Sequence, residues 1–161
     1  PHTMFDEVGH VVHVGFADPY CPRGRAAILA AADADVHPVD GGTLVVIQGP
    51  RFSTKAESRM HQSFGGTIVG MTGVPEASVA RDLALCYSTV CLVTDHDAGV
   101  DGGEAVSHHE VLAQFAANIE VLKALLTRTI AGLPVHEPDD ATATCTCRHA
   151  LDGQDLPFEL P

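Results

Sequence analysis

Short apolar runs alternate with helix-like segments along most of the chain. Turn residues flank four apolar runs, at residues 11–16, 45–47, 67–71 and 87–94. Runs of this length that are rich in β-branched residues are typical of buried strands. Helical spacing or composition marks four further segments, at about residues 23–32, 55–64, 76–85 and 108–133. This alternation predicts an α/β fold with a mixed, largely parallel central sheet flanked by helices.

Local capping signals fix where two of these helices begin. Thr54 and Glu57 match the S/T-x-x-E capping box, in which each side chain satisfies a backbone donor of the other residue. Ser107 precedes the last helix, with Glu110 at its third position. Both helices are therefore expected to start directly after the hydroxyl residue.

Composition narrows the class of protein. The chain has 161 residues, of which 45% are hydrophobic and 19% charged, so one domain with a core is expected. Its net charge of −12, without a basic stripe, argues against nucleic acid or an anionic membrane as a partner. The sequence has no long apolar stretch or signal-peptide pattern, and its five cysteines are scattered, so we expect a cytoplasmic protein.

Three of the predicted strands end in polar loops, at residues 48–54, 71–75 and 95–99. The first of these loops joins the 45–47 strand to the helix that begins after Thr54, and the rest of the chain is organised around this junction. In an open α/β sheet, ligands bind outside the carboxyl ends of the strands. If the three strands are neighbours, their loops form one ligand crevice.

The sharpest local signal is Asp95 and Asp97, which flank His96 after an apolar run. A carboxyl group at a hydrophobic mouth can act as a proton donor or hydrogen-bond partner near neutrality. The same pattern also fits surface acids or a turn cap. Asp95 is the candidate for the buried member of the pair because it follows the apolar residues directly.

Other loop residues suggest contacts with a flat ring or an anion. Phe52 and Met71 could hold a planar ring between an aromatic face and a thioether, although the pattern alone favours ordinary core filling. Thr72, ahead of Gly73, could present a hydroxyl to phosphate, but this signal alone is weak.

Ten histidines raise the question of a metal. His108, His109, Cys145, Cys147 and His149 can be drawn together as a zinc site. The C-x-C spacing is tighter than the C-x₂₋₄-C pairs of structural zinc sites, so no metal is expected. A disulfide between the two cysteines or a pair of free thiols is favoured instead.

Three separated motifs carry a resemblance to a known family. The segments are VVHVGFADPYCPRGR, GGTLVVIQGPRFSTKAES and GMTGVPEASVARDLALCYSTVCLVTDHDAG. They resemble the trimeric purine nucleoside phosphorylase and 5′-methylthioadenosine phosphorylase superfamily, most closely its methylthioadenosine branch, over about residues 1–130. The resemblance implies a phosphorylase/nucleoside hydrolase-like sandwich, with residues 1–134 as the C-terminal part of one domain and 135–161 as a polar linker and tail.

This resemblance implies a pentosyltransferase that cleaves the N-glycosidic bond of 5′-methylthioadenosine with phosphate as co-substrate, in purine and methionine salvage. No cofactor is implied. By motif position, Asp95 would be the catalytic partner of purine N7, and Asp97 would support it. Phe52 and Met71 would line base and ribose, Thr72 would touch phosphate or sugar, and Arg51 would have a structural role.

Four positions bear on substrate choice and assembly. The 6-oxopurine enzymes resemble this loop but carry glutamate and asparagine where Ser53 and Asp95 stand, which favours a 6-aminopurine here. His108 could bind a 5′-hydroxyl or line a wider pocket, which leaves adenosine and other 5′-modified nucleosides open. His13 resembles a residue lent to a neighbouring subunit, which implies a homotrimer.

The family's first phosphate loop and its Arg-His phosphate pair have no counterpart in these 161 residues. We therefore expect the isolated chain to be inactive unless an N-terminal half, or a complementing N-terminal chain, supplies them. The alternative from another class is a non-catalytic nucleoside-binding fragment.

Overall fold

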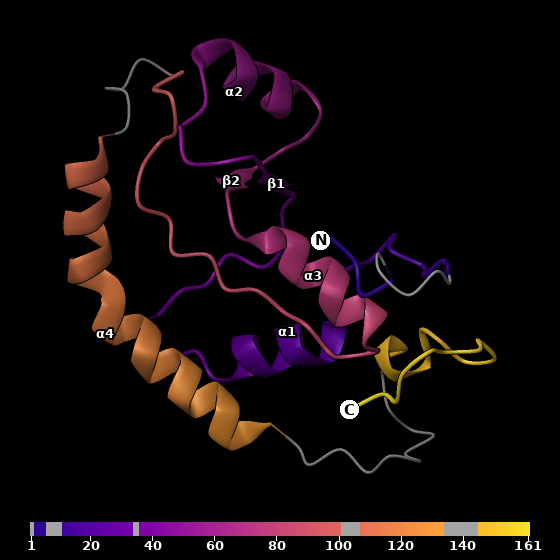
Figure 1. Cartoon of the computed structure of the whole chain (residues 1–161). Helices are drawn as coiled ribbons and strands as arrows, with labels where there is room; N and C mark the ends of the chain where they lie inside the picture. The colour runs from indigo at the N-terminus through magenta and orange to yellow at the C-terminus, as the bar shows by residue number, and fades with distance from the viewer. Residues whose placement is uncertain (1, 6–10, 34–35, 101–106, 134–144) are drawn as a thin grey trace. The chain divides into compact units, whose positions relative to one another are not determined.

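A parallel strand pair joined through a helix forms the centre of one part of the molecule. In this computed structural model, the described residues are 2–5, 11–33, 36–100, 107–133 and 145–161. Strand β1 (Leu44–Val46) pairs with β2 (Ile68–Gly70), and helix α2 (Lys55–Ser63) lies between them in sequence (Figure 1). Parallel strands joined through a helix confirm the predicted α/β class.

The register of the strand pair places both carboxyl ends at one edge. Leu44 is opposite Ile68, and Val46 is opposite Gly70. One more backbone bond, from the Ile47 amide to the Gly70 carbonyl at 2.9 Å, follows the last strand pair. The loops that leave β1 and β2 therefore start side by side.

Helix α2 begins as the sequence predicts. The Thr54 hydroxyl accepts from the Glu57 amide, and the Glu57 carboxylate accepts from the Thr54 amide at 2.7 Å. These reciprocal bonds satisfy two of the backbone donors that a helix start leaves unpaired. The predicted capping box is confirmed.

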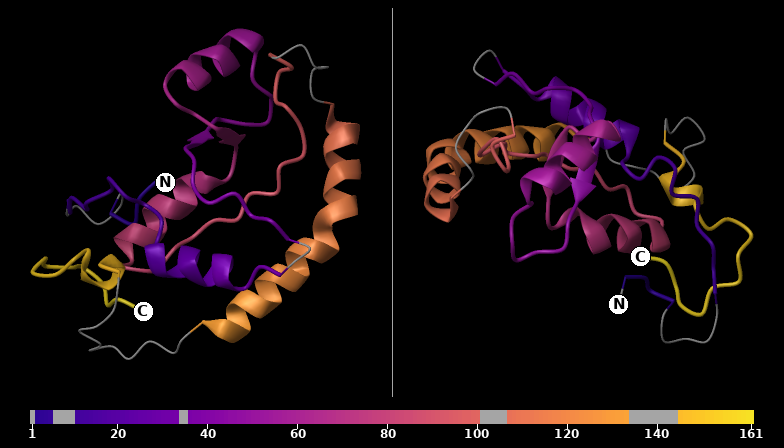
Figure 2. Two further views of the ribbon diagram at one scale, coloured as in Figure 1. Left: turned by 180° about the vertical axis from the view of Figure 1, so that it is seen from behind. Right: turned by 90° about the horizontal axis from the view of Figure 1, so that it is seen from above.

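The chain divides into two compact units. Unit 1 comprises Pro1–Ala31, Gly73–Thr89 and Thr129–Pro161, and unit 2 comprises Ala32–Thr72 and Val90–Arg128. Unit 2 holds the strand pair and α2. Unit 1 holds helices α1 (Pro22–Ala30) and α3 (Gly73–Asp82) and the short 3₁₀ helix η1 (Cys147–His149). Figure 2 shows η1 in yellow, within the C-terminal segment.

The core of unit 1 consists mostly of small and sulfur-containing side chains. Its buried apolar residues are Phe5, Cys21, Ala77, Ala80, Ala84, Cys145, Cys147 and Leu151. Two charged residues of α3 are also buried, and both are paired: Arg81 donates to the Asp18 carbonyl at 2.7 Å, and Asp82 accepts from the Thr3 hydroxyl at 2.7 Å. These bonds tie three sequence-distant segments together.

Helix α3 starts earlier than expected and is kinked. Val74 has extended dihedrals (φ −123°, ψ 131°) inside the helix, because a residue that precedes proline is disfavoured in the helical region. The last helix, α4 (His108–Gly132), starts at the predicted position. The Ser107 hydroxyl donates to the Glu110 carboxylate at 2.6 Å and accepts from the Glu110 amide at 3.3 Å.

Helix α4 carries several large apolar side chains on the surface. Leu112, Phe115, Leu126 and Ile130 are exposed, whereas Leu125 is buried. None of the helices within the described residues combines the length and the hydrophobicity that a membrane crossing requires.

Two predicted strands are wrong. Residues 11–16 and 87–94 are described and lie outside any strand. Val11 is 75% exposed and Val93 is 64% exposed. A strand forms only when a neighbouring backbone supplies donors and acceptors, and β1 and β2 are the only strands paired in the described part of the chain. The apolar run at residues 45–47 is partly rather than fully buried.

Candidate active site

Two of the three predicted ligand loops meet at the carboxyl edge of the strand pair. A Cβ placed on Gly49, in the loop after β1, would lie 2.9 Å from the sulfur of Met71, which directly follows β2. The backbone at residue 49 therefore passes directly against the Met71 side chain. This contact confirms that the loops at 48–54 and 71–75 adjoin.

The third loop presents a fixed pair of carboxylates. Asp95 accepts from the Thr94 hydroxyl at 2.7 Å and from the Asp97 amide at 2.8 Å, one bond to each carboxylate oxygen. Asp97 in turn accepts from the hydroxyl of Ser58, a buried residue of α2. Each carboxylate oxygen has two lone pairs, so these bonds orient Asp95 and leave it capacity for a ligand.

Asp97 occupies its place through an unusual backbone conformation. Its φ is +50°, in the left-handed region that aspartate and asparagine enter more readily than most residues. This turn brings the Asp97 amide back to the Asp95 carboxylate. The Ser58 hydroxyl was not singled out from the sequence, because a serine inside a helix gives no signal of a contact 39 residues away.

A pocket of about 210 Å³ lies between the first loop and α2. It is lined by Ile47, Gln48, Arg51, Ser53, Glu57, Met60 and His61. Among the described residues, the Ser53 hydroxyl and His61 Nδ1 are buried there without a hydrogen-bond partner. Buried polar atoms are normally paired, so these two are available to a polar ligand or to water. Ser53 is the predicted site residue that lines this pocket.

Arg51 has the structural role expected of it. Its guanidinium forms a forked pair with the Glu57 carboxylate at 2.8 and 2.7 Å and donates to the Phe52 carbonyl at 3.0 Å. The Arg51 guanidinium, together with the amide and hydroxyl of Thr54, lowers the pKa of Glu57 well below its ordinary value. Arg51 thereby braces the loop on the first turn of α2.

The remaining predicted residues lie at the surface of their units. Phe52 is 38% exposed, and Thr72 and His108 are also exposed in unit 2. Met71 is half-buried against Gly49. His13 belongs to unit 1 and is exposed. The predicted roles of these residues stay predictions.

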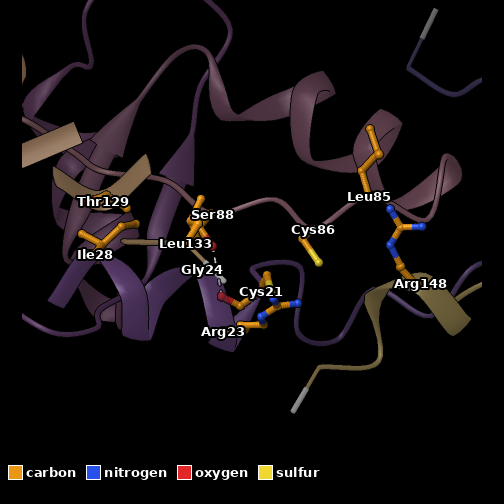
Figure 3. Close-up of a pocket in the computed structure, with 10 residues that line it drawn as sticks. All are labelled: Cys21, Arg23, Gly24, Ile28, Leu85, Cys86, Ser88, Thr129, Leu133 and Arg148. Atoms are coloured by element: carbon orange, nitrogen blue, oxygen red, sulfur yellow. Dashed lines mark hydrogen bonds between the residues drawn. The ribbon is translucent and has the colours of Figure 1, made fainter. Parts of the chain in front are cut away.

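Unit 1 holds a larger pocket that contains none of the predicted site residues. Its volume is about 430 Å³, and apolar side chains, two arginines and two cysteines line it (Figure 3). Four cysteines converge beside it, at positions 21, 86, 145 and 147. Sequence reasoning missed this cluster, because its first and last members are 126 positions apart, the difference between 147 and 21.

Comparison with known protein families shows which family the chain belongs to. Residues 1–131 match the family model described as the phosphorylase superfamily. Because this match covers most of the chain, the chain belongs to the phosphorylase superfamily.

Two curated relatives show the level of similarity. The chain is 52% identical to a purine nucleoside phosphorylase of Streptomyces coelicolor, and 48% identical to an S-methyl-5′-thioadenosine phosphorylase of Mycolicibacterium smegmatis. These matches cover 100% and 99% of this chain but 59% and 57% of the relatives. The chain therefore spans somewhat more than half the length of the relatives it matches.

A solved structure agrees on the fold. A methylthioadenosine phosphorylase from an antarctic soil metagenomic library is 32% identical and superposes with a TM-score of 0.76. The match covers 94% of this chain and 52% of that protein. The predicted phosphorylase-type fold is confirmed, for a chain that corresponds to part of it.

Proposed function

We propose that the protein containing this chain catalyses phosphorolysis of 5′-methylthioadenosine to adenine and 5-methylthioribose 1-phosphate. The observation that carries the proposal is the oriented Asp95 carboxylate at the loop edge of a phosphorylase-superfamily chain. The relatives named above are phosphorylases of purine nucleosides and of S-methyl-5′-thioadenosine, which supports the reaction type.

In this reaction the bond between ribose C1′ and purine N9 breaks, and a bond from a phosphate oxygen to C1′ forms. The electron pair of the broken bond goes to the purine, so the leaving group needs a proton or hydrogen bond at N7. In the proposed reaction Asp95 is that partner: two internal hydrogen bonds orient its carboxyl group, and one of the remaining lone pairs carries the proton that is donated to N7. Positioning and electrostatics then carry catalysis, without a covalent enzyme intermediate or a cofactor.

Asp97 holds Asp95 through its amide, while Ser58 on α2 holds Asp97. A carboxylate accepts hydrogen bonds from an exocyclic amine, and Ser53 offers an unpaired buried hydroxyl. Both groups support a 6-aminopurine as the base. In the proposed complex, Phe52 and Met71 line the base and ribose, Thr72 contacts phosphate or a sugar hydroxyl, and His108 lies toward the 5′ substituent.

A second candidate is a phosphorylase for adenosine or for another 5′-modified purine nucleoside. The relative with 52% identity is a purine nucleoside phosphorylase, which favours this alternative. His108 is exposed at the start of α4 and is able to donate a hydrogen bond to a 5′-hydroxyl.

Release of free purine from methylthioadenosine, adenosine and inosine, with and without phosphate, tests both candidates in the full natural polypeptide that contains this chain. We expect phosphate-dependent release, fastest with methylthioadenosine and at least ~100-fold slower with inosine. Adenine release that ignores phosphate would overturn phosphorolysis. Equal rates with inosine would overturn the 6-aminopurine assignment, and faster release from adenosine would establish the second candidate.

We further propose a cytoplasmic homotrimer in which His13 reaches the 5′ pocket of a neighbouring subunit. All five cysteines are free thiols in the structure, which supports a reducing compartment. Sedimentation of the full polypeptide tests the assembly: a monomer that retains full activity would contradict it.

A further inference from the structure

Four cysteine thiols converge in unit 1 from three separate segments. Cys21 lies at the start of α1, Cys86 follows α3, and Cys145 and Cys147 lie at the start of η1. All four sulfur atoms lie within 4.8 Å of one another, and the Sγ atoms of Cys86 and Cys145 are 3.6 Å apart. Each of the four is a free thiol.

Distances of this size fit tetrahedral binding of one ion. A zinc ion with bonds of about 2.3 Å to sulfur places its four ligands about 3.8 Å apart. The sulfur atoms of Cys86 and Cys145 are already near that separation, and a contraction of at most about 1 Å brings in the others. The C-x-C spacing argued against zinc in the sequence, but here Cys21 and Cys86 supply the second pair.

The surroundings favour thiolates together with a cation. Cys21, Cys145 and Cys147 are at most 5% exposed, and Cys86 is exposed to solvent beside the pocket of Figure 3. Thiolates in such a place need positive charge nearby, because burial penalises the charged form of a group.

Groups of positive charge or potential border the cluster. The backbone amides of Gly24 and Arg23, in the first turn of α1, donate to the Cys21 sulfur. The Arg81 guanidinium lies close enough to Cys147 to act on it electrostatically. The cluster thus combines amides and a guanidinium that offset part of the charge of bound thiolates.

We propose that Cys21, Cys86, Cys145 and Cys147 bind one zinc ion in a tetrahedral, four-thiolate structural site. Binding releases the thiol protons to solvent and changes no oxidation state. The ion joins the start of α1, the segment after α3 and the segment at η1, in a unit whose own core is built from small side chains. The exposed side of Cys86 gives the ion a route in.

Metal content tests the site in the full polypeptide, purified with reductant and without chelator. We expect roughly one zinc per chain by elemental analysis. Double replacement, Cys145→Ser with Cys147→Ser, should lower the zinc content at least ~10-fold. The matched control is Cys91→Ser, because Cys91 is exposed and lies outside the cluster; it should keep the zinc.

The first of two further measurements does not depend on whether the variants fold. Replacing zinc by Co²⁺ in the unaltered protein should give the sulfur-to-cobalt charge-transfer absorption of tetrahedral thiolate coordination. A strong chelator should lower the melting temperature of the unaltered protein and of Cys91→Ser, and should leave that of the double variant unchanged.

Two results would overturn the proposal. One is metal-free protein that fails to take up zinc or Co²⁺ in its reduced state. The other is native protein whose intact mass shows disulfides among these four cysteines. Neither readout uses enzymatic activity, so the site can stand or fall separately from the proposed phosphorolysis.

Discussion

Helix α3 of unit 1 and the candidate-site loops of unit 2 hold their polar groups differently. In unit 1, Arg81 and Asp82 are buried at 8% and 4% exposure and bond to segments more than 60 positions away in sequence. In unit 2, the Arg51–Glu57 pair is on the surface and spans six positions, and Asp95 is bonded to its neighbours Thr94 and Asp97. The bond from Ser58 to Asp97 is a longer-range contact of these loops.

The contrast separates polar groups that hold the fold from those that are available to a ligand. A buried charge that loses its partner keeps the full cost of desolvation, whereas a surface pair is replaced by water at little cost. Loops that are ordered by short-range bonds can therefore carry chemistry without holding the unit together. Four substitutions test whether the polar groups of the loops serve activity while those of α3 hold the fold.

The largest expected effect is on activity. Asp95→Asn should lower kcat/KM for methylthioadenosine at least ~100-fold in the full polypeptide, because the amide cannot supply the proton or the negative charge. The melting temperature should change little. Steady-state kinetics and thermal unfolding measure the two effects, and the matched control is Asp152→Asn, an exposed aspartate of unit 1. Unchanged kinetics would remove Asp95 from the site.

The next effect is on the stability of unit 1. Arg81→Ala removes a buried guanidinium and its charge-assisted hydrogen bond to the Asp18 carbonyl, so the free energy of unfolding should fall by about 2–3 kcal/mol. Urea unfolding measures the loss. Arg51→Ala in unit 2 is the comparison, because that side chain is 64% exposed. An equal loss in both variants would contradict the contrast between the units.

A smaller effect is expected at the start of α2. Thr54→Ala removes the hydroxyl that accepts from the Glu57 amide and should cost about 1 kcal/mol. Thr54→Ser keeps the cap and should stay close to the unaltered protein. The matched change in α4 is Ser107→Ala, which breaks the same kind of cap. A destabilisation by Thr54→Ser as large as that by Thr54→Ala would show that the cap is not the cause.

The smallest effect is a pH dependence. The pKa of Glu57 is lowered in the folded chain, so its stabilising effect is present above its ordinary pKa, near 4.5, and is lost as pH falls through the folded pKa. The Glu57→Gln variant should not show this part of the loss of unfolding free energy at low pH, because glutamine does not titrate. Unfolding free energies of both proteins from pH 7 downward measure it. Parallel curves would show that the ion pair with Arg51 contributes nothing.

The sequence predicted the features that depend on residues close together in the chain better than those that depend on distant residues. The capping pairs Thr54–Glu57 and Ser107–Glu110 lie within one turn, so sequence reading placed both helix starts correctly. The runs at residues 11–16 and 87–94 have strand-like composition, but pairing depends on a distant backbone, and neither is a strand.

In the candidate site, too, contacts between residues close together in the chain were predicted and distant ones were not. Asp95 and Asp97 adjoin a strand-like run and were visible in sequence, whereas Ser58 bonds to Asp97 across 39 positions and gave no signal. The four cysteines show the limit most clearly. Cys145 and Cys147 look too close together for zinc by themselves, and only the fold brings Cys21 and Cys86 to them.

The left-handed backbone at Asp97 restricts how this loop can evolve. Most residues would add roughly 1 kcal/mol or more of strain at φ +50°, whereas asparagine and glycine would enter at little cost. A homologous loop that changes its substrate is therefore expected to pass through asparagine or glycine at this position. The backbone restricts the replacements before selection on chemistry acts.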